Sequence, residues 1–321
     1  MLEHILVADV GGTNARFALA ASPQVGRNEL SQSLSLPTRD YSGLVPAVNA
    51  YLDQISGLKP TRACIAVACP VWADNVCLTN NHWSFSVLDV RRTLGLEHLL
   101  VVNDFKALAA GVPYLDVDER VQIGAGLPVA GRPLSVIGPG TGLGVATIAC
   151  HGSGHLVVDG EGGHVGFAPG NEREMEILRL LGRRYGRVST ERILSGEGLG
   201  VLHKALAEID SVRVDDFDAR DIVGKANAGT CQRCLDSIEI FCSILGSFAG
   251  DTALTMSSQG GVYIGGGIVP RIAKLLEKSP FRQRFEDKGR MVDFIKDVPT
   301  YLITTDHAAL AGAASLLRAD T

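Results

Sequence analysis

The stretch VADVGGTNARFAL, Val7–Leu19, is an apolar strand that turns on three small residues and leaves as a second apolar strand. Such a hairpin needs small residues at 11–13, but it needs neither Asp9 before the turn nor Arg16 after it. Clustered glycines at a strand end let a backbone approach a ligand closely. The stretch therefore predicts either a tight hairpin alone or one part of a binding site. Arg16 could face a phosphate or pair with a carboxylate at the hairpin base, and we favour the pairing.

A second stretch, LSVIGPGTGLGVATIA (Leu134–Ala149), has the same order of apolar strand, glycine-rich turn and apolar strand. Two such hairpins, each followed by helical patterns, predict a duplicated α/β fold with two lobes and a cleft between them. We expect strands at 5–7, 16–20, 63–68, 99–102 and 300–303, and helices at 43–55, 106–110 and 308–318.

Two helical patterns in the second half make further predictions about packing. In EREMEILRLLGRRYG, helical spacing places Met175, Leu178, Leu181 and Tyr185 on one face. A longer pattern, residues 231–254, is apolar around most of its circumference and predicts a buried helix. Its two glycines at 246 and 250 would let another helix come close.

Length, charge and cysteine content limit the classes of function. The chain has 321 residues, enough for two domains, and a net charge of −5 that argues against nucleic acid or an anionic membrane as its main partner. No leader pattern and no membrane-spanning apolar run are found, so we expect seven reduced cysteines in a cytoplasmic protein. Cys231 and Cys234 form a single CxxC, for which core packing is favoured over a zinc site because no second pair follows.

Three glycine-rich turns, at residues 11–13, 138–144 and 265–267, are candidates for holding phosphate groups. Residues 126–131 have the glycine spacing of a Walker A loop but are not followed by its lysine. The glycines at 138–144 lead into a strand, whereas those of a Rossmann fingerprint lead into a helix. Backbone N–H groups of glycine turns can nevertheless hold phosphate oxygens. A hairpin explains each turn alone. Three turns in order, with GVYIGGGIVPR leading into a helix, favour a phosphate site.

Polar side chains also gather outside the glycine turns. Asn103 and Asp104 follow an apolar strand in VVNDF, where the acid is either a helix cap or a functional group. Such a pair can bind neighbouring hydroxyls, and the acid can accept a proton from an attacking hydroxyl. Glu161 and His164, in DGEGGHVGFAP, lack a third metal ligand at fixed spacing and fit hydroxyl binding better. Glu191 is either an early-helix acid or a further polar ligand.

These motifs resemble those of the bacterial glucokinases, the non-repressor group that phosphorylates glucose with ATP. Six motifs follow in family order from the first strand to the last helix: DVGGTNAR, NDF, GPGTGLG, EGGHVGFAP, ERILSG and GGGIVPR. The resemblance implies the two-lobed actin/hexokinase-like (ribonuclease H-like) fold, in agreement with the two hairpins. We place the small α/β lobe in residues 1–108 plus 300–321 and the large α/β lobe in residues 109–299.

The resemblance also implies a reaction and a site. Asp104 is the expected general base for transfer of the γ-phosphoryl group of ATP to the 6-hydroxyl of glucose, and Asp9 the expected Mg²⁺ ligand, directly or through water. Zinc is not expected, and a homodimer is. The residues expected to bind glucose are Asn103, Asp104, Glu161, His164 and Glu191. Those expected to bind ATP are Ala8, Asp9, Val10, Gly11, Gly12, Thr13, Gly138, Gly140, Thr141, Gly142, Gly266 and Gly267.

Two alternatives remain beside this interpretation. One is a non-catalytic sensor that binds sugar and ATP, and the other is a kinase that accepts a broader range of hexoses. A transcriptional regulator with the same core would need a basic helix-turn-helix, and no such pattern precedes the first strand. The sequence leaves open how strictly glucose is preferred and whether other phosphoryl donors are used.

Overall fold

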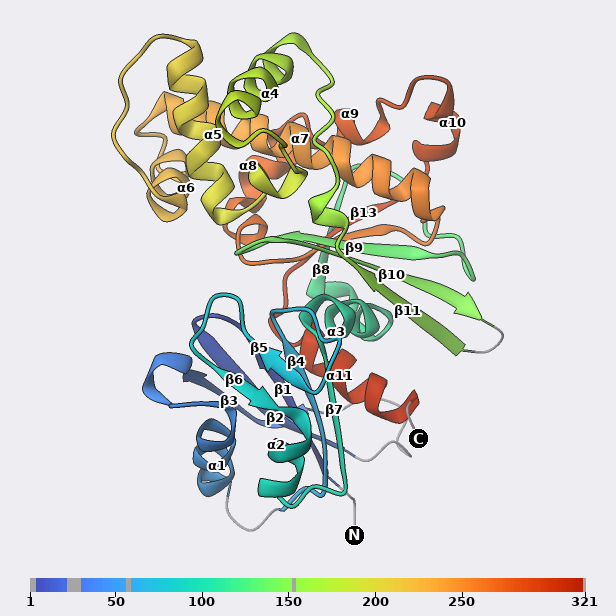
Figure 1. The fold of residues 1–321 in the computed structure, drawn as a ribbon. Coiled ribbons are helices and arrows are strands. Elements are labelled where there is room, and N and C mark those ends of the chain that lie inside the picture. Colours follow the sequence, from blue (N-terminus) through green and yellow to red (C-terminus); the bar gives the residue numbers. More distant parts are fainter. Residues whose placement is uncertain (1–3, 22–29, 56–58, 152–153, 320–321) are drawn as a thin grey trace. The chain divides into compact units, whose positions relative to one another are not determined.

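The computed structural model describes residues 4–21, 30–55, 59–151 and 154–319. The chain divides into two compact units, one comprising residues 1–116 and 305–321 and the other residues 117–304. Each unit is an α/β domain built on one principal sheet (Figure 1).

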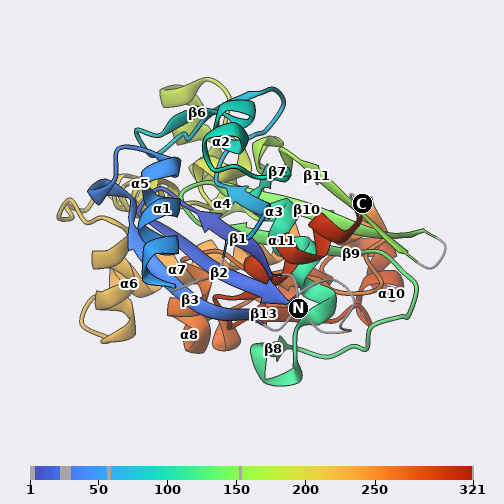
Figure 2. The ribbon, with the colours of Figure 1, turned by 90° about the horizontal axis from the view of Figure 1, so that it is seen from below.

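The first unit contains a five-stranded sheet in the spatial order β3-β2-β1-β4-β7. β1 is antiparallel to β2 and parallel to β4, and β7 is parallel to β4. Figure 2 shows β1, β2 and β3 running side by side in this sheet. The strands of the unit, including a small β5-β6 hairpin, are β1 (His4–Val10), β2 (Asn14–Ala21), β3 (Leu30–Pro37), β4 (Arg62–Val67), β5 (Asn75–Cys77), β6 (Ser84–Ser86) and β7 (His98–Asn103).

Four helices cover the two faces of this sheet: α1 (Leu44–Gln54), α2 (Val87–Thr93), α3 (Asp104–Gly111) and α11 (Ala308–Ala319). Because side chains alternate along a strand, Leu6 and Ala8 enter the core that contains α1, while Ile5 and Val7 enter the core that contains α11. β1 is thus buried on both faces, as a central strand should be. The same alternation places Asp9 on the α11 face, at the end of the strand.

The second unit repeats the topology of the first. Its sheet has the order β11-β10-β9-β12-β13-β8. β9 is antiparallel to β10 and parallel to β12, which is parallel to β13. This is the pattern of β1, β2, β4 and β7, so the predicted duplication is confirmed. The strands are β8 (Arg120–Ile123), β9 (Leu134–Pro139), β10 (Leu143–His151), β11 (Gly154–Gly160), β12 (Val262–Ile264) and β13 (Thr300–Ile303).

The chain crosses between the units at other positions than we expected. β13, placed with the small lobe in our prediction, pairs with β12 and β8 in the second sheet. Residues 109–116 belong to the first unit, where α3 packs closely along α11. Partners far apart in the sequence decide both assignments, strands for β13 and the helix α11 for residues 109–116, and a local pattern does not reveal such partners.

The helices of the second unit surround one long central helix, α7. Length and composition alone would let α7 cross a membrane, yet most of its apolar window is buried inside the unit, as in the core helix of a globular domain. A Cβ at Gly246 or Gly250 would meet the carbonyl oxygen of Phe281 or Phe285, so the predicted close approach of another helix is confirmed. The helices are α4 (Glu172–Tyr185), α5 (Gly196–Ile209), α6 (Ala219–Asn227), α7 (Gln232–Met256), α8 (Ala273–Lys278), α9 (Phe281–Glu286) and α10 (Val292–Ile295).

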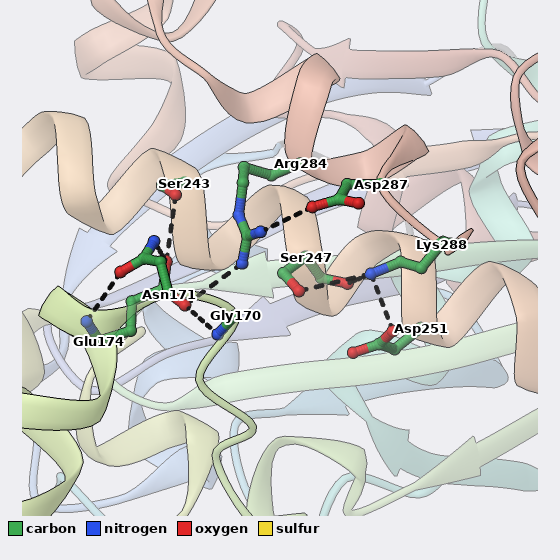
Figure 3. Close-up of polar contacts among 9 residues, drawn as sticks. All are labelled: Gly170, Asn171, Glu174, Ser243, Ser247, Asp251, Arg284, Asp287 and Lys288. Atoms are coloured by element: carbon green, nitrogen blue, oxygen red, sulfur yellow. Dashed lines mark hydrogen bonds and ion pairs between the residues drawn. The ribbon is translucent and has the colours of Figure 1, made fainter.

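The buried face of α4 differs from the predicted one, because it includes a carboxylate. Glu174, Ile177 and Leu181 are buried, whereas Tyr185 is exposed. The Glu174 carboxylate accepts hydrogen bonds from the Gly170 N–H, the Asn171 amide and the Ser243 hydroxyl, and it pairs with Arg284 at 3.2 Å (Figure 3). A buried acid is tolerated when its oxygens are satisfied in this way. The network ties the segment before α4 to α7 and α9.

Candidate functional site

Backbone and side-chain hydrogen bonds within the first unit fix the conformation of the turn after β1. The Gly11 N–H donates to the carbonyl of Asn14 at 2.9 Å, and the Thr38 hydroxyl donates to the carbonyl of Gly12 at 2.9 Å. A Cβ at position 12 would lie 2.9 Å from the carbonyl oxygen of Asn80, so the neighbouring loop leaves room only for glycine. Thr13 is exposed at the tip of the turn.

Ala8 and Val10, which we expected at the ATP site, are buried in the core of the first unit. Ala8 pairs with Phe17 on one side and Ile65 on the other, so its backbone also lies inside the sheet. These residues therefore build the strand that carries the turn.

Asp9 and Arg16 are cross-strand partners at the base of the hairpin. The Arg16 guanidinium lies 3.5 Å from the Asp9 carboxylate and 3.4 Å from that of Asp306. The pairing that we favoured for Arg16 is thus present, and the arginine holds two carboxylates of the first unit.

Asn103 and Asp104 divide the two roles that the sequence left open. Asn103 is the N-cap of α3, where its side-chain oxygen accepts from the Phe105 N–H at 2.9 Å and its amide donates to the carbonyl of Cys69 at 3.3 Å. Asp104 is the first helical residue, and its Oδ1 accepts from the same Phe105 N–H at 3.0 Å. The cap is therefore the amide, which fixes the start of the helix and leaves the carboxylate for another task.

The electrostatics of this corner suit a base. Burial, followed by repulsion from Asp9, raises the pKa of Asp104 from its ordinary value of 3.8 to about 7, against hydrogen bonds that lower it. Burial also raises the pKa of Asp9, although the Arg16 cation opposes the rise. A carboxylate whose pKa lies near neutrality can both take up and release a proton under cellular conditions.

In the second unit, the turn between β9 and β10 is bound to Glu191. The Leu143 N–H donates to Oε2 of Glu191 at 2.8 Å. A Cβ at Gly142 would lie 2.4 Å from that same oxygen, so this contact requires glycine. The Gly140 carbonyl accepts from the Gly196 N–H at the start of α5 at 2.8 Å. The second predicted phosphate turn is thus anchored on both sides, and Thr141 is exposed at its tip.

The three residues predicted to bind sugar from this unit lie together. Nε2 of His164 is 3.6 Å from Oε1 of Glu191 and 3.9 Å from Oε2 of Glu161. His164 ends the short 3-10 helix Gly162–His164, and Glu191 lies in the 3-10 helix Thr190–Arg192. A polar pocket of about 150 Å³ is lined in part by Thr141, His164 and Glu191. Its oxygen and nitrogen atoms can bind several hydroxyl groups at once.

The third glycine turn packs against the second. Gly266 has φ of 85°, and a Cβ there would lie 2.4 Å from the carbonyl oxygen of Pro139. Position 266 thus needs glycine for the fold itself. Gly267 is exposed and has open space where a side chain would be, so a ligand could approach its backbone.

Several residues that position this site gave no signal in the sequence. The Arg187 guanidinium donates to the His164 carbonyl at 2.7 Å, and the Thr190 N–H donates to the Val165 carbonyl at 2.9 Å. These bonds pair the segment that carries His164 with the segment that carries Glu191. Within the described ranges, no group of three or more His, Cys, Asp or Glu side chains could hold a metal ion.

Comparison with known proteins decides the family. The sequence profile described as Glucokinase matches residues 6–320, almost the whole chain. The chain belongs to the glucokinase family. A glucokinase of Chromobacterium violaceum is 47% identical over 312 residues, which cover 97% of this chain and 88% of that protein.

Solved structures agree with this family. The crystal structure of a glucokinase from an Antarctic psychrotroph has a TM-score of 0.90 at 39% identity and covers 99% of this chain and 100% of its own. A ROK family glucokinase from Streptomyces griseus, in complex with glucose and AMPPNP, has a TM-score of 0.66 at 20% identity and covers 98% and 99%. That second likeness concerns the fold alone. The fold of the glucokinase family is the predicted actin-like, hexokinase-like α/β fold.

Proposed function

We propose that this chain is an ATP-dependent glucose kinase, which transfers the γ-phosphoryl group of ATP to the 6-hydroxyl of glucose. The observation that carries the proposal is Asp104, a carboxylate beside the cap residue Asn103 whose pKa is raised to about 7, in a chain that the Glucokinase profile matches over residues 6–320. Relatives named glucokinase, at 43–47% identity over nearly the whole chain, support the same reaction.

The residues of this chain divide the work as follows. Asp104 orients the 6-hydroxyl and accepts its proton as that oxygen attacks the γ-phosphorus in line. Asn103 keeps one amide N–H for a sugar hydroxyl, because its other polar contacts are used within the protein. Glu161, His164 and Glu191 accept from or donate to the remaining hydroxyls. Backbone N–H groups at residues 12–13 and 141–142, with that of Gly267, hold the nucleotide, while the N–H groups of Gly11 and Gly140 close the two turns.

Asp9 is the residue that would hold Mg²⁺, directly or through water. The donor is a carboxylate, which suits this cation. Burial disfavours the negative charge of Asp9, and Asp9 and Asp104 repel each other when both are charged. A bound cation would offset both costs. The residues present therefore fit the ion. When bound, Mg²⁺ supplies positive charge to the phosphate oxygens.

A coupled assay with ATP, Mg²⁺ and a panel of hexoses tests the proposal. We expect ADP to form only with a sugar, with glucose giving the highest kcat/KM. Comparable values for mannose or 2-deoxyglucose would favour the broader hexose kinase. Binding of glucose and ATP by well-folded protein without ADP formation would favour the non-catalytic sensor and overturn the proposal.

Two further parts of the proposal concern the state of the protein in the cell. We place it in the cytoplasm, in line with the supply of ATP and the reduced cysteines expected from the sequence. We also propose a homodimer, as the family resemblance implies, and light scattering coupled to size-exclusion chromatography measures that state directly.

A further inference from the structure

The CxxC motif at Cys231 and Cys234 has no role in the proposed function, yet it has a defined geometry. Cys231 is the N-cap of α7, a helix of 25 residues, and Cys234 lies in its first turn. The Cys234 N–H donates to the Cys231 sulfur at 3.4 Å. The cap position usually holds Ser, Thr, Asp or Asn, so a sulfur here replaces an oxygen acceptor at a helix N-terminus.

The two cysteines of the first turn differ in exposure. Hydrogen bonding with the Cys234 side chain lowers the pKa of Cys231. Lys225, on the neighbouring α6, lowers it further. Cys234 is completely buried, and burial raises its pKa to about 12. The pair thus combines a half-buried thiol stabilised as thiolate with a protected partner, the arrangement of reactive CxxC dithiols.

Four other cysteines whose side chains the structure describes lack this combination. Cys64, Cys69 and Cys242 are buried in strand, loop and helix interior, and burial raises the pKa of Cys69 to about 11 and of Cys242 to about 12. Cys77 is exposed on β5, where its sulfur contacts the Ser84 hydroxyl at 3.1 Å. None of these four lies at a helix N-terminus.

We propose that Cys231 and Cys234 form a redox-active dithiol, which a peroxide converts into an intramolecular disulfide in the folded protein. The Cys231 thiolate attacks one oxygen of hydrogen peroxide, which breaks the O–O bond, forms a sulfenic acid and releases hydroxide. The Cys234 sulfur then attacks the sulfenic sulfur. A disulfide forms, the S–OH bond breaks, and the hydroxide leaves as water with the Cys234 proton. Overall, two thiols lose two electrons and the peroxide becomes two waters.

The local structure favours this step without unfolding. Residues three apart in a helical turn are neighbours on its surface, and here the Cys234 N–H already donates to the Cys231 sulfur at 3.4 Å. The new bond forms within one turn at the helix start. The buried body of α7 keeps its packing, so the oxidised protein should remain folded.

Peptide mapping of peroxide-treated wild-type protein tests the proposal. Trypsin cleaves after Arg233, between the two cysteines, so the disulfide joins peptides 226–233 and 234–271. We expect this cross-linked pair in most chains after treatment of folded protein, lighter than the two separate peptides by two hydrogen atoms. Fragmentation distinguishes Cys234 from Cys242 in the longer peptide. A dithiol reductant should restore both free thiols, and circular dichroism should stay unchanged throughout.

Three variants separate the steps. Cys77→Ser, the matched control, should give the cross-link in wild-type yield. Cys234→Ser should stop at a sulfenic acid on Cys231 that a dimedone probe captures, and Cys231→Ser should give no cross-link. Because Cys234 is buried, its variant could fail to fold, and the wild-type mapping then decides alone. The proposal is overturned if Cys77 is oxidised while the cross-link is absent, or if the cross-link requires urea.

Discussion

Replacing Asp104 by Asn should abolish most of the catalysis and at the same time stabilise the first unit above neutral pH. The amide cannot accept the proton of the 6-hydroxyl, so kcat should fall about 10²-fold or more while glucose still binds. The amide oxygen can keep the hydrogen bond from the Phe105 N–H. The buried negative charge, which costs folding free energy, disappears.

The size and sign of the stability gain follow from the pKa of Asp104. A rise from 3.8 to about 7 means that the folded chain keeps a proton that the unfolded chain has lost. Below pH 3.8 Asp104 therefore costs no stability. Its cost grows as the pH rises towards about 7 and is constant above that pH. The full shift corresponds to about 4 kcal/mol, and because the side chain is partly exposed we expect about 1–3 kcal/mol at pH 8. At pH 5 the gain should be less than half as large.

Tryptophan fluorescence during urea denaturation measures this gain in stability for the first unit, which contains Asp104. The chain has two tryptophans, Trp72 and Trp83, and both lie in the first unit, with Trp83 buried in its core. Asp53→Asn is a matched control, because it removes an exposed carboxylate of α1 in the same unit. It should change neither the pH dependence nor the activity.

Two results would refute this reasoning. Near-normal turnover of the Asp104→Asn variant would remove Asp104 from its role as base. Equal free energies of unfolding for variant and wild type at pH 5 and pH 8 would show that the carboxyl is not penalised by burial, whatever its role in catalysis.

Three other predictions follow from the same structure. Gly142→Ala should lower kcat/KM at least tenfold with an unchanged melting temperature, because its Cβ would displace the Glu191 carboxylate; wild-type kinetics would contradict this. Gly250→Ala should lower the free energy of unfolding by about 1–3 kcal/mol, since its Cβ would lie 2.4 Å from the Phe285 carbonyl oxygen, whereas Gly224→Ala, on an open helix surface, should raise it by about 0.5–1 kcal/mol. The kcat/KM for glucose should decrease as the pH falls below about 7, because protonation inactivates the proposed base, and a flat profile from pH 5 to 8 would exclude it.

Local sequence patterns were sufficient for the strands and helices that we predicted and for the repeated hairpin. The predicted strand at 300–303 coincides with β13, and the predicted helix at 43–55 differs from α1 by one residue at each end. Alternation and helical spacing report which residues a strand or helix buries, so these elements could be found from their own residues. The predictions for 5–7 and 16–20 fell within the longer β1 and β2 for the same reason.

Spacing failed where a distant partner decides the outcome. Glu174 interrupts the apolar face of α4 because Arg284 and Ser243, more than sixty positions away in the sequence, satisfy its oxygens. β13 joined the second sheet because β12 and β8 accept it there. Neither partner can be read from the segment itself.

The sequence by itself determined the order of the motifs, the duplicated strand pattern and the chemical types present at the site. Tertiary structure decided their roles: that Asn103 and not Asp104 caps α3, that Ala8 and Val10 serve the core, and that Glu191 binds the second glycine turn. The physical reason is that capping, burial and pKa depend on which groups meet through space. Asp104 is a carboxylate in any chain, but only burial beside Asp9 brings its pKa to about 7.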